Sequence, residues 1–229
     1  MPLYRQAGQI PSKRHIVFRN SNGSLFHEEL FGTEGFGGMS SLVYHLYPPT
    51  QVKQRGTPYS VRPKIVIEDN LQARSYLTFN AISQPDYIKS RTVLFVNDDM
   101  SIGIAAPSSS MTNYFYKNAD SDEMIFIHEG GGILKSMYGN IPFKYGDYLI
   151  IPRGTVYQLD FNQAQNKLLI VESHGPIETP ARYRNQYGQF LEHAPFCERD
   201  LRAPETLITH DEKGDFLINI KKRGLIYPY

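Results

Sequence analysis

Short apolar runs, separated by glycine and proline, follow one another along most of the chain. The composition fits this pattern, with 16 Tyr, 13 Phe, 18 Gly and 15 Pro. Aromatic and β-branched residues favour strands, while glycine and proline favour the turns that join them. The clearest runs lie at residues 92–96, 100–104, 124–127, 132–134, 148–151, 157–161 and 167–171. The pattern predicts an all-β fold whose short strands form a closed or sandwiched double-sheet barrel.

The amino-terminal part predicts further strands ahead of this barrel. Residues 25–32 and 41–47 are typical of two strands around a glycine-rich connection, and Pro48 ends the second because proline cannot donate to a ladder. A polar, proline-containing stretch over 51–63 then leads to another predicted strand at 64–68. We therefore expect extra strands and a linker over residues 1–63, packed on a barrel that occupies residues 64–172.

The carboxy-terminal part has a different composition. Beyond residue 172 the chain is rich in proline and charged side chains, which indicates an irregular connection. Residues 215–229 predict a strand, a turn and the beginning of another strand, and the chain stops there on aromatic residues. Because a strand needs partners for its backbone groups, we expect residues 173–229 to be a connection plus the first strands of a second barrel absent from this chain.

Charge and cysteine content narrow the possible partners. The 229 residues include 24 basic and 23 acidic side chains and carry a net charge of +1, which favours neither nucleic acid nor an anionic membrane. A single cysteine excludes an intrachain disulfide, and no apolar run approaches the roughly 18 residues that span a bilayer. The first residues lack the apolar core of a signal peptide. We expect a soluble cytoplasmic protein whose partners are small molecules or other protein chains.

Two segments resemble the signature blocks of cupin barrels. They are Asp122–Leu134, which contains the triplet Gly130-Gly-Gly132, and Gly146–Gly154, which contains Pro152-Arg-Gly154. The resemblance implies a cupin-like double-stranded β-helix, a jelly-roll barrel, here with extra N-terminal strands and an irregular C-terminal connection. The glycine triplet is best explained as a tight hairpin that requires positive φ.

The same resemblance places the cupin metal positions on residues that suit a metal poorly. Cupins use a paired His-x-His, a glutamate five residues later, and a histidine three residues after the second block's glycine. In this register those positions hold Tyr116 and Asn118, then Glu123, then Tyr157. Two phenols, an amide and one carboxylate do not form the imidazole-rich site that binds Fe, Mn or Zn. We expect no metal in this barrel.

Five segments in this order resemble homogentisate dioxygenases over almost the whole chain. They are Leu25–Gly32 with Leu42–Pro48, Tyr114–Ile127, Gly146–Gly154 and Val171–Glu178. The resemblance implies an Fe(II) oxidoreductase that opens the aromatic ring of homogentisate in tyrosine and phenylalanine breakdown. It also implies a subunit with two related barrels, a homo-oligomer, and iron ligands in the carboxy-terminal barrel, where a histidine and a glutamate are spaced H-x5-E.

That iron site cannot be carried over to this chain. None of the seven histidines has a Glu or Asp six residues further on. We therefore expect Fe(II) to be held outside this chain, no catalytic residue within it, and no ring-opening activity from it alone. Two other readings remain open: a non-catalytic cupin that serves as a binding or assembly module, and a metal-free isomerase that uses Glu123 and Tyr157 for acid–base chemistry.

Two further segments have predicted roles. The composition of residues 107–116 suits a mobile loop that could close over a neighbour's active site, with Tyr116, and Tyr114 beside it, contacting the substrate. The alternative is that Tyr116 fills the barrel mouth. The basic run Lys221-Lys-Arg223 is expected at a solvated hairpin tip.

Overall fold

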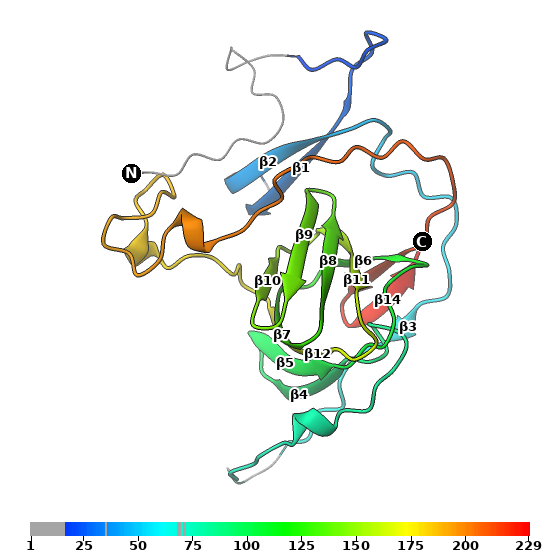
Figure 1. Ribbon diagram of the computed structural model, residues 1–229. Helices are drawn as coiled ribbons and strands as arrows, with labels where there is room; N and C mark the ends of the chain where they lie inside the picture. The colour runs from blue at the N-terminus through cyan, green and yellow to red at the C-terminus, as the bar shows by residue number, and fades with distance from the viewer. Residues whose placement is uncertain (1–16, 35, 68–69, 71) are drawn as a thin grey trace.

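The computed structural model describes residues 17–34, 36–67, 70 and 72–229, so the first sixteen residues of the expected N-terminal unit lie outside the described part. Strands dominate this part (Figure 1). Helix is limited to three short 3-10 segments, Thr78–Asn80, Ala181–Tyr183 and Glu198–Asp200. Within the described ranges, no helix is long and apolar enough to cross a membrane.

Two sheets form the barrel, and every strand pairing in them is antiparallel except one. The five-stranded sheet has the order β10 (Tyr148–Ile151), β7 (Asp122–Glu129), β12 (Lys167–Ser173), β5 (Met100–Ala105) and β4 (Thr92–Val96). The seven-stranded sheet has the order β3 (Tyr59–Ser60), β14 (Leu225–Pro228), β13 (Ile218–Lys222), β6 (Phe115–Asn118), β11 (Val156–Phe161), β8 (Gly131–Ser136) and β9 (Gly139–Lys144). The predicted all-β, cupin-like jelly roll is confirmed.

Buried and partly exposed side chains alternate along β7 and β12, and this alternation decides which side chains face the interior. Burial follows a period of two, so Ile125 and Ile127 on β7 and Leu168 and Ile170 on β12 point into the core. The same period turns Glu123 and Glu172 inward. These two glutamates are directly opposite each other in the register of β7 and β12. Because like charges at opposed positions repel, this pair requires cations in the barrel centre.

The glycine triplet forms the predicted turn. Gly130 has a φ of 111°, which an L side chain rarely adopts. At Gly132 an added Cβ would lie 2.0 Å from the backbone oxygen of Asp160 on the neighbouring strand. The triplet therefore serves the turn between β7 and β8 and the close pairing of β8 with β11, as expected for a hairpin.

The N-terminal strands form a separate two-stranded sheet. β1 (His27–Glu34) and β2 (Gly37–His45) pair in antiparallel register beside the β8–β9 end of the barrel (Figure 1). Phe31 packs edge-to-face against Tyr138, with ring centroids 5.5 Å apart. The two predicted strands are thus present, and an aromatic contact connects their sheet to the barrel.

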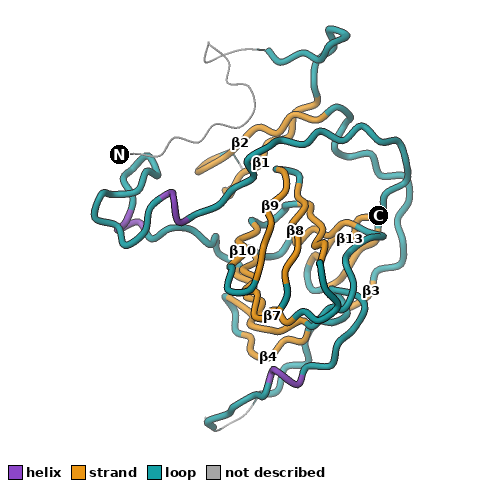
Figure 2. Tube along the Cα trace, in the orientation of Figure 1, coloured by secondary structure: helices purple, strands orange, loops and turns teal. Residues whose placement is uncertain are grey.

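The prediction of a strand at residues 64–68 is wrong. Residues 64–67 have no regular structure, and residue 68 lies outside the described part. Ile65, Val66 and Ile67 are 65%, 78% and 89% exposed. An apolar run has no reason to adopt a strand where no neighbouring strand pairs with it, and here it remains within the long loop that precedes β4 (Figure 2).

The carboxy-terminal strands join the barrel itself. β13 pairs in parallel with β6, and β14 pairs with β13 and with β3. The turn between them is held by Asp120, whose carboxylate accepts the backbone N–H groups of Arg223 and Gly224 at 2.7 and 3.1 Å. The connection after β12 is irregular, as expected. The strands that follow it, β13 and β14, lie in the seven-stranded sheet, so part of the segment expected to be a connection is paired with the barrel of this chain.

Candidate functional site

The four residues at the degenerate metal positions come together in the barrel centre. Tyr116 and Asn118 lie on β6, Glu123 on β7 and Tyr157 on β11. None of the four is more than 2% exposed. Tyr157 is directly opposite Tyr116 in the register of the two strands. The resemblance to cupins therefore located a genuine interior cluster.

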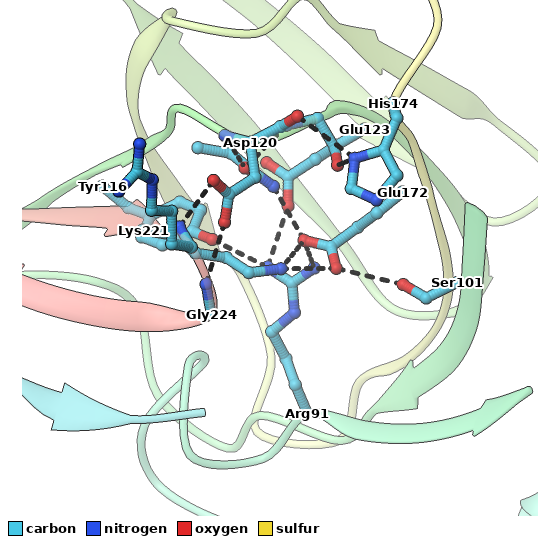
Figure 3. A network of polar contacts seen from close by, with 12 residues as sticks. Arg91, Ser101, Tyr116, Asp120, Glu123, Glu172, His174, Lys221 and Gly224 are labelled. Atoms are coloured by element: carbon cyan, nitrogen blue, oxygen red, sulfur yellow. Dashed lines mark hydrogen bonds and ion pairs between the residues drawn. The ribbon is translucent and has the colours of Figure 1, made fainter. Parts of the chain in front are cut away.

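Arg91, the residue immediately before β4, supplies a cation to this cluster. Its guanidinium donates through Nη1 to Glu123 Oε1 at 2.8 Å and through Nη2 to Glu172 Oε1 at 3.0 Å. Nη1 also lies 3.3 Å from the Tyr116 hydroxyl, and the guanidinium lies 5.4 Å from the centre of the Tyr87 ring. Figure 3 shows the Arg91 side chain reaching the two carboxylates. A planar fork of donors suits this double contact better than a point charge would.

Lys221, from β13, supplies the second cation. Its ammonium lies 2.6 Å from both carboxylate oxygens of Glu172. Asn118 Nδ2 donates to Oε1 of the same carboxylate at 2.7 Å, and Ser101 Oγ donates to Oε2 at 3.2 Å. Two cations thus face two carboxylates, and the interior cluster carries no net charge when all four groups are ionised.

Buried phenols complete the surroundings of Glu123. The Tyr157 hydroxyl donates to Glu123 Oε2 at 2.8 Å, so both oxygens of this carboxylate have partners. The Tyr87 hydroxyl lies 3.5 Å from that of Tyr157. The Tyr116 ring packs edge-to-face against Tyr157, with centroids 5.5 Å apart. These large rings fill the space in which a substrate would otherwise have to fit.

The ionisation of the cluster follows from these contacts. Burial alone would raise the pKa of Glu172, but the charges of Arg91 and Lys221 outweigh burial and lower that pKa to about 2. Burial and then the Glu123 carboxylate raise the pKa values of the Tyr116 and Tyr157 phenols well above their ordinary range. The Tyr116 and Tyr157 phenols are therefore neutral at ordinary pH, and the Glu172 carboxylate is an ionised acceptor.

The donors present do not fit Fe(II). Each carboxylate oxygen already accepts from a cation, a phenol or a hydroxyl, and no imidazole lies among the partners of Glu123 and Glu172. Across the described ranges, no three His, Cys, Asp or Glu side chains are grouped so that they could share a metal ion. Arg91 and Lys221 supply the positive charge that a metal would otherwise provide.

Hydrogen bonds and packing hold segment 107–116, predicted to be a mobile loop, against β11 and the core. The Ser110 hydroxyl donates to Asp160 at 2.9 Å and accepts the backbone N–H of Phe161 at 2.8 Å, while Met111 is buried and bonded to β11. Tyr114 packs on the core, where burial and the nearby Asp86 raise the pKa of its phenol. Tyr116 faces the barrel interior and not a lid. The composition of the segment did not indicate these contacts, because β11 is remote from it in sequence.

The sequence reasoning missed half of the cluster. The solvated hairpin tip predicted for residues 221–223 is confirmed for Lys222 and Arg223, which are exposed at the turn between β13 and β14. It is wrong for Lys221, whose side chain is only 16% exposed and which lies opposite Asn118 in the parallel pairing of β13 with β6. Arg91 lies far from the cupin blocks in sequence. Glu172 had a detectable signal, because it continues the inward series of Leu168 and Ile170 with a charged residue.

Removing the Tyr157 hydroxyl tests the phenol–carboxylate contact. The change Tyr157→Phe is expected to lower the free energy of unfolding by about 1–3 kcal/mol, because one oxygen of a buried carboxylate loses its donor. Urea denaturation measures the loss. Tyr187→Phe is the control, since Tyr187 is 79% exposed and its change should stay within about 0.5 kcal/mol. Equal stability of the two variants would show that the contact is unimportant.

Close packing around Glu123 and Tyr157 argues against the hypothesis of a metal-free isomerase. It requires Glu123 and Tyr157 to converge in a pocket, and they do lie in hydrogen-bond contact. Both are 0% exposed, however, and the Arg91 guanidinium and the Tyr116 ring occupy the adjoining space. A substrate could reach them only after this packing had opened, so the arrangement favours a structural role for the pair.

Comparison with known proteins supports the sequence resemblance. Residues 77–190 match the family model described as homogentisate 1,2-dioxygenase N-terminal. A protein from Saccharolobus solfataricus, provisionally named a dioxygenase, is 39% identical over 221 residues, which cover 96% of this chain and 56% of that protein. The chain therefore spans about half the length of this curated relative.

Solved structures with a similar arrangement are also found. A cupin-2 domain-containing protein from Shewanella frigidimarina is 20% identical, with a TM-score of 0.32, covering 37% of this chain and 79% of its own. A cupin superfamily protein from Desulfitobacterium hafniense is 14% identical, with a TM-score of 0.38, covering 48% of this chain and 98% of its own.

Proposed function

We propose that this chain, whose residues 77–190 match the family model described as homogentisate 1,2-dioxygenase N-terminal, is the amino-terminal part of an oxidoreductase that opens an aromatic ring with O₂ at Fe(II). The proposed substrate is homogentisate or a closely similar dihydroxyphenyl acid, and the proposed setting is cytoplasmic breakdown of tyrosine and phenylalanine. The iron is proposed to lie outside this chain. The chain contributes a barrel that is stable without a metal.

The proposal that the iron lies outside this chain rests on one observation, the occupied barrel centre. Ring cleavage at Fe(II) needs open coordination positions for the substrate and O₂. Here each oxygen of the interior carboxylates already accepts from Arg91, Lys221 or Tyr157, and the two buried cations repel a further positive ion. A relative of greater length supports the idea that further protein completes the enzyme.

The filled interior also bears on the non-catalytic alternative. A binding module would hold an organic ligand in the barrel cavity, but Tyr87, Tyr116 and Tyr157 occupy that space and are at most 1% exposed. An assembly role would use the exterior, where Tyr148 and Ile150 on the edge strand β10 are 60% and 44% exposed. We propose that the protein forms a homo-oligomer, a property that suits an assembly module and a dioxygenase equally.

Oxygen uptake tests the proposal. The natural polypeptide that contains this sequence, loaded anaerobically with Fe(II), is expected to consume O₂ in proportion to added homogentisate. Residues 1–229 produced alone are expected to consume none above a metal-free control. Inactivity of both proteins would contradict the dioxygenase proposal and favour the assembly module. Iron-dependent uptake by residues 1–229 alone would contradict the assignment of the iron to another part of the enzyme.

A further inference from the structure

The centre of the barrel has the form of a cation site. Glu123 and Glu172 lie opposite each other on neighbouring strands, and both point inward. Side-chain exposure is 1% for Glu123 and 9% for Glu172, so water cannot screen the two charges effectively. The pair is stable as two carboxylates only with positive charge between them.

We propose that this is a binding site for a planar monovalent cation, filled from within the chain by the Arg91 guanidinium. Three features support it. Each terminal nitrogen of the guanidinium donates to a different carboxylate, at 2.8 and 3.0 Å. The rings of Tyr87 and Tyr116 flank it, with centroids 5.4 and 5.9 Å away. Aromatic faces beside paired acceptors are the surroundings that a guanidinium ion prefers.

Lys221 has a different part in the cluster. Its ammonium contacts Glu172 and thus compensates one of the two carboxylate charges. Without Arg91, one negative charge would remain uncompensated in the centre. The vacated space would then suit a small cation of single charge with several N–H donors, which is the chemistry of guanidinium and methylguanidinium.

The position of Arg91 allows its side chain to be removed while the strands that carry its acceptors stay in place. Arg91 precedes β4, whereas the groups that surround its guanidinium come mainly from β6, β7 and β12. Truncating its side chain therefore removes the cation without altering the strands that carry the acceptors. This inference goes beyond the proposed dioxygenase function and does not depend on it.

Chemical rescue tests the proposal. The change Arg91→Ala in residues 1–229 is expected to lower Tm by about 6–20 °C, because a buried ion pair loses one partner. Added methylguanidinium, at millimolar concentration and constant ionic strength, is expected to restore at least half of that loss along a saturating curve. The wild type should show no such rise. Neither should Arg202→Ala, the matched control, because Arg202 is half exposed and pairs with the single carboxylate of Asp147.

Three results would overturn the proposal: an unchanged Tm in Arg91→Ala, a loss that methylguanidinium does not reverse, or an equal response in the wild type. Stabilisation by Mn²⁺ in place of methylguanidinium would also overturn it, since the site would then select a divalent metal. If Arg91→Ala does not fold, refolding from urea with and without methylguanidinium gives the same comparison. Arg91→Lys keeps the charge but loses the fork, so its Tm is expected to fall, and an unchanged Tm would contradict the proposal.

Discussion

Replacing Glu172 with alanine is expected to lower the free energy of unfolding by about 3–5 kcal/mol. Glu172 accepts from Arg91, Lys221, Asn118 and Ser101, so its removal leaves two buried cations with too little negative charge and two further donors without their acceptor. Glu123 alone cannot compensate both cations. The loss is large because the charges are buried, which also makes it largely insensitive to salt.

Urea denaturation at neutral pH measures this loss, with Glu178→Ala as the matched control. Glu178 also pairs with an arginine, Arg184, at 2.6 Å, but its side chain is 39% exposed. The exposed pair is expected to contribute at most about 1 kcal/mol. A loss below about 1 kcal/mol for Glu172→Ala would mean that the interior network does not stabilise the barrel.

Acidification is expected to remove about 3 kcal/mol of stability through the same residue. The pKa of Glu172 is about 2 in the folded chain, against an ordinary value of 4.5. A carboxyl whose pKa is depressed by folding stabilises the fold fully above the ordinary value, and this contribution disappears as the pH falls from about 4.5 through about 2. The magnitude follows from the size of the pKa shift.

The pH dependence is isolated by comparing the wild type with Glu172→Gln. The stability difference between them, measured by urea denaturation from pH 7 to pH 2.5, is expected to be constant above about pH 5 and to shrink below it. Carboxylates outside the cluster affect both proteins alike and cancel in the difference. A difference that does not change with pH would show that Glu172 does not titrate with a depressed pKa.

The residues of the site that could be predicted are those whose positions follow from the local sequence around the two cupin blocks. Tyr116, Asn118, Glu123 and Tyr157 fall at fixed offsets from the two cupin blocks, and strand periodicity sends their side chains inward. Their types predicted that a metal would bind poorly. They could not predict what takes its place, because that depends on chain segments outside the blocks.

The missing residues are placed by pairings between distant segments. Lys221 reaches the centre because β13 lies parallel to β6, with Lys221 opposite Asn118. A basic run beside a turn resembles a solvated tip when this pairing is unknown. Similarly, Ser110 holds its segment by bonding to Asp160 on β11. Composition describes a local tendency to be mobile, whereas contacts between distant residues decide whether the segment moves.

We propose that the barrel interior has a structural role in this chain. Its buried cluster joins β6, β7, β11, β12 and β13 with the residue that precedes β4, so both sheets are tied at one point. A scaffold of this kind can position neighbouring protein without taking part in oxygen chemistry. It also explains how a cupin-like barrel can keep its glutamate position while losing the histidines.

The most direct test of the account is a crystal structure of residues 1–229 grown with excess Mn²⁺, with anomalous scattering recorded to locate the metal. The expected result is planar guanidinium density between Glu123 and Glu172, with no anomalous peak in the barrel centre. An anomalous peak bonded to Glu123, with the Arg91 side chain displaced from it, would contradict the account.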